Sequence, residues 1–309
     1  MHTIAIIGGG LAGLAAAHEL ETRRIPYTLI EVKGRLGGSL ISERRAGFVL
    51  DGGPFAFPAD DDWSFLDALG LAAPFEVRRG RVAFADGAQS LVDALARRLT
   101  GVIRLRMAVS SLGYMDGQFA ICLENGLMET ARALIVAAPA RFAERLLRTL
   151  APEAALRLDG YLYDTITRVA LGFRRDQIGD AGRRLWDMGL PFYYETEHPS
   201  RVPPGGVLLQ VGVRYPLTRT TPAAVIAHLQ ADLGWPPHPL VSRVDYWPEA
   251  DPVPPHAPGF HEAMAALRRL LPPGVALAGS DYDGLRLGAR VAAGRAAARQ
   301  AAAFVEAGR

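Results

Sequence analysis

The residues best suited to chemistry in this chain are glycines in a turn that follows a short apolar run. The apolar run covers residues 3–7, and the turn covers residues 8–13, after which the composition favours a helix. Gly8 permits a tight turn, Gly10 lets backbone amides approach a pyrophosphate, and Gly13 lets the helix pack closely on the strand. The start of such a helix offers free N–H groups and partial positive charge to phosphates. This arrangement predicts a dinucleotide site.

A carboxylate follows at the position that such a site requires. Residues 27–32 read as a second parallel strand, and Glu31 lies in it, 18 residues after Gly13. There the carboxylate can accept hydrogen bonds from the adenosine ribose hydroxyls. It would repel a 2′-phosphate, so we expect FAD or NAD rather than NADP.

Two more glycine clusters extend the pattern. The first, residues 34–39, comes directly after the ribose-binding strand and is followed by residues 48–57. The second begins where the apolar run 274–278 enters a turn at 279–284, before an alanine-rich helix from about residue 287 to residue 306. Each end of the chain therefore predicts a strand, a turn and a helix aimed at a ligand.

The first of these clusters resembles a known family. Flavin amine oxidases, phytoene desaturases and protoporphyrinogen oxidases follow the ribose glutamate with an arginine and a paired glycine, matched here by Arg35, Gly37 and Gly38. Many members carry arginine where this chain has Ser39. The pair Gly53-Pro54 resembles the protoporphyrinogen-oxidase version of the next motif, where the chain passes near the flavin.

The second cluster is similar to the closing motif of protoporphyrinogen oxidases at Gly279, Tyr282, Gly284 and Gly294. The resemblance implies that this turn contacts the ribityl chain and that the following helix begins at the isoalloxazine. A positive helix end would stabilise the negative charge of reduced flavin. Ser280 or Asp281 can hydrogen-bond a ribityl hydroxyl, and the sequence does not choose between them.

The resemblance covers the first 60 and the last 55 residues and implies an α/β fold. It implies a Rossmann-like FAD-binding domain of the glutathione-reductase type, with a smaller α+β substrate domain built on an antiparallel sheet. We expect the FAD-binding domain in residues 1–58, 100–160 and 255–309, and the substrate domain in residues 59–99 and 161–254. Protoporphyrinogen oxidases insert a longer helical region where this chain has residues 60–88.

The expected cofactor is non-covalent FAD, because the only cysteine, Cys122, lies inside a predicted strand. No catalytic side chain is assigned, since the flavin carries the chemistry. Aromatic residues are frequent between residues 161 and 247, and Tyr193, Tyr194 and Tyr282 are candidates for lining the site. The expected cofactor contacts are Gly8, Gly10, Leu11, Ala12, Gly13, Glu31, Val32, Arg35, Gly37, Gly38, Ser39, Gly53, Pro54, Val109, Ala138, Gly279, Ser280, Asp281, Gly288, Ala289 and Val291.

The leading hypothesis is an FAD-dependent oxidoreductase that moves a hydride from a small or planar organic substrate to flavin N5. Many amine oxidases place a lysine near N5, but the only lysine here, Lys33, follows the ribose-binding strand. Two alternatives stay open: an FAD-binding partner or redox sensor with little turnover, and an NAD-dependent dehydrogenase. The NAD-dependent dehydrogenase predicts a colourless purified protein, whereas the FAD-dependent oxidoreductase predicts a yellow one.

The amino-acid composition limits the classes of molecule that the protein is expected to bind. The net charge of +2 is spread over scattered arginines, so nucleic acid is not expected. One cysteine allows no internal disulfide and no Cys-based metal site, which indicates a reducing, cytoplasmic setting. No run reaches the roughly 20 apolar residues of a membrane-spanning helix. A small-molecule substrate is expected, no metal is predicted, and the oligomeric state is left open.

Overall fold

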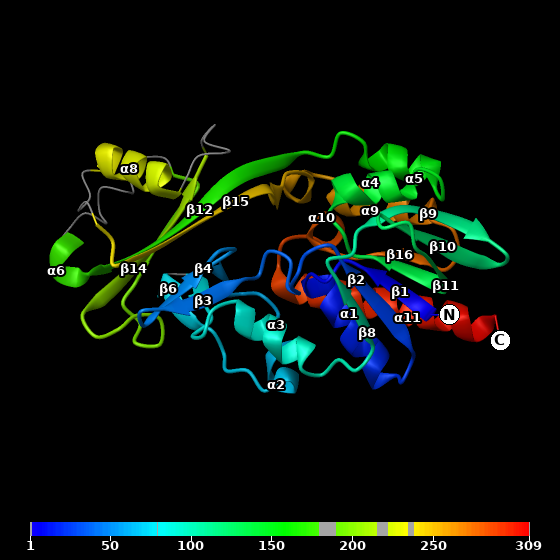
Figure 1. The fold of residues 1–309 in the computed structure, drawn as a ribbon, viewed down its shortest axis with the longest axis horizontal. Coiled ribbons are helices and arrows are strands. Elements are labelled where there is room, and N and C mark those ends of the chain that lie inside the picture. The colour runs from blue at the N-terminus through cyan, green and yellow to red at the C-terminus, as the bar shows by residue number, and fades with distance from the viewer. Residues whose placement is uncertain (1, 79, 179–189, 215–221, 234–237, 309) are drawn as a thin grey trace.

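The computed structural model describes residues 2–78, 80–178, 190–214, 222–233 and 238–308, in which two large β-sheets stand side by side (Figure 1). The main sheet has the strand order β8-β2-β1-β11-β10-β9, and β16 also pairs with β11. Its strands are β1 (His2–Ile7), β2 (Tyr27–Glu31), β8 (Val102–Leu105), β9 (Val109–Met115), β10 (Gln118–Leu123), β11 (Met128–Val136) and β16 (Val275–Leu277).

The centre of this sheet is parallel. Strand β1 pairs with β2 and β11, β2 pairs with β8, and β11 pairs with β16, all in parallel register. Residues 4–7 of β1, β2, the second half of β11 and β16 are buried, mostly apolar runs, as expected where helices cover both faces, whereas β8 at the sheet edge is partly exposed. Their carboxyl ends share one edge of the sheet, which is where ligands bind in folds of this type.

Helices cover both faces. On one face, α1 (Leu11–Thr22) packs against α11 (Leu287–Ala307), and α3 (Gln89–Ala96) joins the same apolar cluster. The contact between α1 and α11 is tight, because a Cβ at Gly294 would come 2.1 Å from the carbonyl oxygen of Ala12. The other face is covered by α4 (Ala140–Leu147), α5 (Pro152–Leu158) and α9 (Phe260–Arg269). Apolar residues of β9 and β10 belong to the same cluster as these helices.

The second sheet is antiparallel, with the order β13-β14-β12-β15. Its outer face is apolar, and Val169, Leu171 and Phe173 form a cluster there with residues of β14 and with Ile226 of α8 (Pro222–Leu233). Its inner face carries the alternate side chains, such as Arg168. The strands are β12 (Tyr163–Arg174), β13 (Phe192–Thr196), β14 (Gly206–Val213) and β15 (Val241–Pro252).

Short elements connect the two sheets. The guanidinium of Arg201 forms an ion pair with the carboxylate of Asp51, and both side chains are 1% exposed. Because Asp51 ends β4, this pair fixes the loop that follows. The short elements are β3 (Ser42–Arg45), β4 (Phe48–Asp51), β5 (Phe57–Pro58), β6 (Phe75–Arg78), β7 (Arg81–Ala83), α2 (Phe65–Leu69), α6 (Arg175–Ile178), η2 (Pro254–His256) and α10 (Ser280–Asp283).

The predicted elements at both ends of the chain are present. The expected strand at 274–278 is β16, and the expected helix from 287 to 306 is α11. The presence of these elements does not by itself divide the chain into domains. Helix α3 is expected in the substrate domain from the sequence, but it packs in the same apolar cluster as α1. Two of the aromatic residues between 161 and 247, Trp186 and Tyr215, lie outside the described residues. Among the described helices, none is long and apolar enough to span a membrane.

Candidate cofactor site

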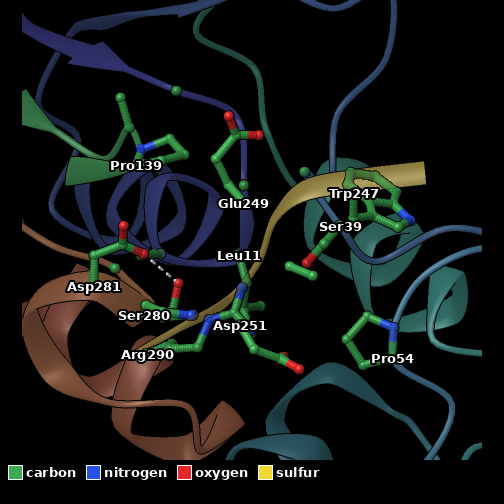
Figure 2. Close-up of a pocket in the computed structure, with 18 of the residues that line it drawn as sticks. Leu11, Ser39, Pro54, Pro139, Trp247, Glu249, Asp251, Ser280, Asp281 and Arg290 are labelled. Carbon is green, nitrogen blue, oxygen red and sulfur yellow. Dashed lines mark hydrogen bonds between the residues drawn. The ribbon is translucent and has the colours of Figure 1, made fainter. Parts of the chain in front are cut away.

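One cavity of about 1160 Å³ lies at the carboxyl edge of the main sheet and extends to the inner face of the antiparallel sheet (Figure 2). Gly10 of the first glycine turn and Gly279 of the last turn both line it. Strands β1 and β16 flank β11 and both run parallel to it, so the turns that follow them open at the same edge. The two ends of the chain thus build one site.

The first turn leaves its backbone open to the cavity. Gly8 has a φ of 107°, which L side chains rarely adopt, and a Cβ at Gly10 would meet nothing within 4 Å. Gly13 packs inward instead, since its Cβ would lie 2.0 Å from the Gly8 carbonyl oxygen. No side chain caps the start of α1. The free amides at this helix end therefore suit a phosphate.

Glu31 is held in place by backbone amides. Its Oε2 accepts a hydrogen bond of 2.6 Å from Gly9 N, and its Oε1 accepts one of 2.7 Å from Lys33 N. The residue is 6% exposed and lines the cavity at the end of β2. A carboxylate fixed in this way can accept further hydrogen bonds from ribose hydroxyls, because each oxygen can accept more than one.

The second glycine cluster packs on the first. Gly37 N donates a 2.7 Å hydrogen bond to Gly9 O, and a Cβ at Gly38 would lie 3.2 Å from the Cα of Gly10. Arg35 donates to the carbonyl oxygens of Leu36 and Gly38, at 3.1 Å and 2.7 Å. Arg35 and Gly37 therefore shape the turn.

The C-terminal turn is fixed by Asp281. Its Oδ2 accepts a 2.8 Å hydrogen bond from Ala140 N and another from the Tyr163 hydroxyl, and its Oδ1 accepts one of 2.8 Å from Ser280 Oγ. Burial and the charge of Asp281 raise the pKa of Tyr163, so this phenol is a hydrogen-bond donor at neutral pH. Ser280 and Asp281 both line the cavity (Figure 2), but Asp281 is already engaged three times.

The start of α11 is capped by a side chain from another segment. Asp61 accepts hydrogen bonds from Leu287 N at 2.7 Å and Gly288 N at 3.2 Å. Beside it, Arg286 forms an ion pair with Asp60 at 2.9 Å. The first two amides of this helix are therefore occupied, whereas the resemblance implied that the helix start faces the isoalloxazine.

The structure sorts the predicted cofactor contacts into two sets. Those outside the cavity lining either shape the turns or belong to the capped helix: Gly13, Arg35, Gly37, Gly53, Gly288, Ala289 and Val291. Those that line the cavity are Gly8, Gly10, Leu11, Ala12, Glu31, Val32, Gly38, Ser39, Pro54, Val109, Ala138, Gly279, Ser280 and Asp281.

Aromatic side chains form the wall opposite the glycine turns, and Phe55, Phe192, Tyr194 and Trp247 line it. The rings of Phe192 and Tyr194 stack with centroids 5.9 Å apart, and those of Phe55 and Tyr194 lie 5.7 Å apart. Trp247 Nε1 donates a 2.5 Å hydrogen bond to Gly52 O. The inner face of the antiparallel sheet is thereby tied to the loop before Pro54.

Only one of the three candidate tyrosines belongs to this wall. Tyr193 packs against the apolar cluster on the outer face of the sheet, because neighbouring residues on a strand point to opposite faces. Tyr282 is 1% exposed, and its hydroxyl donates a 2.8 Å hydrogen bond to Ala138 O. Tyr193 and Tyr282 are thus not among the residues that line the cavity, whereas Tyr194 is.

Charged side chains that sequence reasoning missed also reach the cavity. Arg168 is 7% exposed and lies 3.6 Å from Asp251 and 5.0 Å from the centre of the Phe192 ring. Burial raises the pKa of Asp251. Lys33 lines the cavity too, with its Nζ 4.6 Å from the centre of the Trp247 ring. The alternation of side chains between the two faces of β12 and β15 could have grouped Arg168 with Asp251. It does not tell which face of the sheet is turned toward the cavity.

In the described part of the chain, no three His, Cys, Asp or Glu side chains are grouped to hold a metal ion. Cys122 lies on β10 and is not among the residues that line the cavity.

The residues fit FAD. An uncapped helix start, the fixed carboxylate of Glu31 and a second turn surround one cavity, so fold and site define a nucleotide-binding protein with a Rossmann-like domain. Residues 6–69 match the family described as NAD(P)-binding Rossmann-like domain. Residues 67–302 match the family described as Flavin containing amine oxidoreductase.

The chain therefore belongs to the flavin-containing amine oxidoreductase family; it is a flavin-dependent oxidoreductase with FAD as its cofactor. The assignment sets aside the NAD-dependent dehydrogenase.

Similar proteins include protoporphyrinogen oxidase 2 of Arabidopsis thaliana, 39% identical over 70 residues, which are 22% of this chain and 14% of that protein. Coproporphyrinogen III oxidase of Bacillus subtilis is 37% identical over 60 residues, 18% of this chain and 13% of that protein. The matched segments thus span about one seventh of these relatives.

Solved structures share the fold over nearly the whole chain. A putative protoporphyrinogen oxidase from Exiguobacterium sp. 255-15 superposes with a TM-score of 0.79 at 16% identity, covering 99% of each chain. Putrescine oxidase bound to putrescine gives a TM-score of 0.68 at 14% identity, again covering 99% of each chain.

Proposed function

We propose that this protein oxidises a small or planar organic substrate by moving a hydride from a substrate C–H bond to N5 of FAD. The observation that carries the proposal is that one cavity joins the glycine turns to an aromatic wall on the antiparallel sheet. A cofactor held at the turns leaves that wall as the surface for a second molecule. FAD supplies the hydride acceptor when bound.

The chain's own residues would bind and orient the two reactants. Glu31 and the open amides at Gly10 are suited to the adenosine and phosphate part of FAD, and Ser280 to a ribityl hydroxyl. Asp281 is held by Ala140 N and Tyr163, so we assign it the role of fixing the turn. Phe192, with the stacked ring of Tyr194, would orient a flat substrate and keep water from the reacting carbon.

Two finer features belong to the same proposal. The nucleotide-binding part would be of the glutathione-reductase type, in residues 1–58, 100–160 and 255–309. The substrate part would comprise residues 59–99 and 161–254, and through β13 and β15 it supplies the aromatic wall except for Phe55. Limited proteolysis with and without FAD would test the division, because cleavage should concentrate at the junctions.

The relatives suggest which substrates to test. The names of the similar proteins refer to porphyrinogens and to putrescine. The porphyrinogen does not transfer to this chain, because the sequence matches cover only 13–14% of those relatives. Putrescine does not transfer either, because the matching structure is only 14% identical and shares the fold alone. Reduced porphyrins, amines and dihydronicotinamides therefore form the first screening set.

The test is bleaching of the bound flavin without oxygen. The purified protein is mixed anaerobically with each probe, and the loss of flavin absorption is followed in time. At least one probe should bleach the flavin, and Phe192→Ala should slow this step while FAD remains bound. Tyr114→Ala serves as the control, because Tyr114 is 61% exposed on β9 and does not line the cavity.

A negative screen would favour a different function. If no probe bleaches the flavin although dithionite reduces it, the hydride-transfer proposal fails. The chain would then act as an FAD-binding partner or redox sensor with little turnover, a reading that fits the short segment at residues 60–88.

A further inference from the structure

The start of α11 has no free positive end to offer the cofactor. Its first two amides donate to the Asp61 carboxylate, and a carboxylate at a helix N-terminus offsets the helix dipole. The anionic parts of FAD need compensation from another group on this side of the cavity.

Arg290 is such a group. It lies on the first turn of α11, and Figure 2 shows its side chain extending from the helix into the pocket that it lines. Its Nε is buried and has no hydrogen-bond partner among the described residues. Burial lowers the pKa of Arg290, and the charges of Asp281 and Asp61 oppose that effect.

A buried guanidinium that lines a cavity and forms no ion pair indicates a missing anion. Burying a charged group is costly unless hydrogen bonds and an opposite charge accompany it. The neighbouring Arg286 illustrates the difference, since it donates to both carboxylate oxygens of Asp60. Within the described chain, Arg290 has no such ion pair.

The packing of α11 indicates which part of FAD Arg290 faces. Residues four apart lie on the same face of a helix, and Gly294, four residues after Arg290, packs directly on the Ala12 carbonyl. Arg290 therefore lies on the face turned toward the start of α1, where Gly10 leaves its backbone open. Phosphates bind at such an open turn.

We propose that Arg290 binds the diphosphate of FAD and supplies the positive charge that the capped end of α11 lacks. The proposal rests on FAD binding and is independent of the reaction under Proposed function. Guanidinium groups bind phosphate oxygens through two parallel hydrogen bonds, which a lysine cannot reproduce.

The test measures FAD affinity in deflavinated full-length protein by the quenching of flavin fluorescence. Arg290→Gln should weaken FAD binding by about tenfold or more, and Arg290→Lys should recover part of this loss. Arg299→Gln is the matched control, because it removes the same charge from α11 at an exposed ion pair with Glu19. It should leave the affinity unchanged.

Two further measurements separate the phosphate from the flavin ring. Inorganic pyrophosphate should compete with FAD less well in Arg290→Gln than in the wild type. The midpoint potential of the bound FAD should stay the same in both. Unchanged affinity would overturn the proposal. A changed midpoint potential would also overturn it, because it would place Arg290 at the isoalloxazine.

The stability of the apoprotein tests whether Arg290 has a purely structural role. Because Arg290 forms no ion pair in the described chain, removing its charge should leave the melting temperature of the apoprotein unchanged or raise it, while the increase caused by FAD becomes smaller. A large fall in the apoprotein's melting temperature would show that Arg290 supports the fold instead. None of these readouts needs turnover, so they stand even if no substrate is found.

Discussion

The carboxylate of Asp61 accepts a 2.7 Å hydrogen bond from the amide of Leu287, which lies 226 residues further along the chain. This contact joins the short segment after β5 to the helix that closes the cofactor site. Asp61→Asn should lower the free energy of unfolding by about 1–2 kcal/mol, since the helix start loses its charged cap. Urea denaturation measures the change. Asp86→Asn, at an exposed surface ion pair, should have a smaller effect.

Glu31→Gln should weaken both the fold and FAD binding. Glutamine has one acceptor oxygen, whereas Glu31 accepts from Gly9 N and Lys33 N with separate oxygens. We expect a loss of about 1–3 kcal/mol in unfolding free energy and at least about tenfold in FAD affinity. Urea titration and flavin fluorescence give the two values. Wild-type affinity in this variant would mean that the carboxylate does not bind the ribose.

The buried ion pair between Arg201 and Asp51 calls for a double-mutant cycle. Arg201→Met leaves the Asp51 carboxylate without its partner and should cost about 3–5 kcal/mol. Asp51→Asn in the same chain should restore part of that stability, because the uncompensated charge is gone. The exposed pair of Arg44 and Asp86 provides the comparison, with an expected coupling of about 0–1 kcal/mol. Equal coupling energies in the two pairs would refute the expected difference between the buried and the exposed ion pair.

Asp283 should give stability a dependence on pH. Burial raises its pKa despite the contacts with Arg268 and Gly279 N, so the folded protein holds this proton more tightly than the unfolded chain. The contribution to stability is therefore complete below the ordinary aspartate range and is lost as pH rises through the raised value. Relative to Asp283→Asn, the wild type should lose stability as pH rises from about 4. Urea denaturation at several pH values gives the unfolding free energy of both proteins. Parallel plots of this free energy against pH would contradict the prediction.

Gly294→Ala should force α1 and α11 apart. A Cβ at this position would lie 2.1 Å from the carbonyl oxygen of Ala12, and neither backbone can yield without moving its helix. We expect a loss of about 1–3 kcal/mol in unfolding free energy and weaker FAD binding. Gly113→Ala is the control, because a Cβ there meets nothing within 4 Å.

The nucleotide-binding part of the fold could be predicted because its signals are local. The turn before α1 and the carboxylate of Glu31 depend on the spacing of a strand, a turn and a helix, and the structure places them on one cavity. The last turn, at Gly279, follows the same rule.

The substrate side depends on relations that the sequence does not contain. Tyr193 and Tyr194 are neighbours of the same type, and only the position of the sheet decides which of them faces the cavity. Asp61 stands among three consecutive aspartates, and which of them caps α11 depends on a contact between distant segments. Arg168 is an ordinary strand residue until β15 brings Asp251 beside it.

Because the cavity needs both Gly10 and Gly279, it can form only late in the synthesis of the chain. When the first turn leaves the ribosome, the strand that completes the far side has not yet been translated, and β1 lacks β11 beside it. A nascent chain arrested before residue 275 should therefore be unable to retain FAD. The protein is therefore expected to bind its cofactor only after most of the chain has been synthesised.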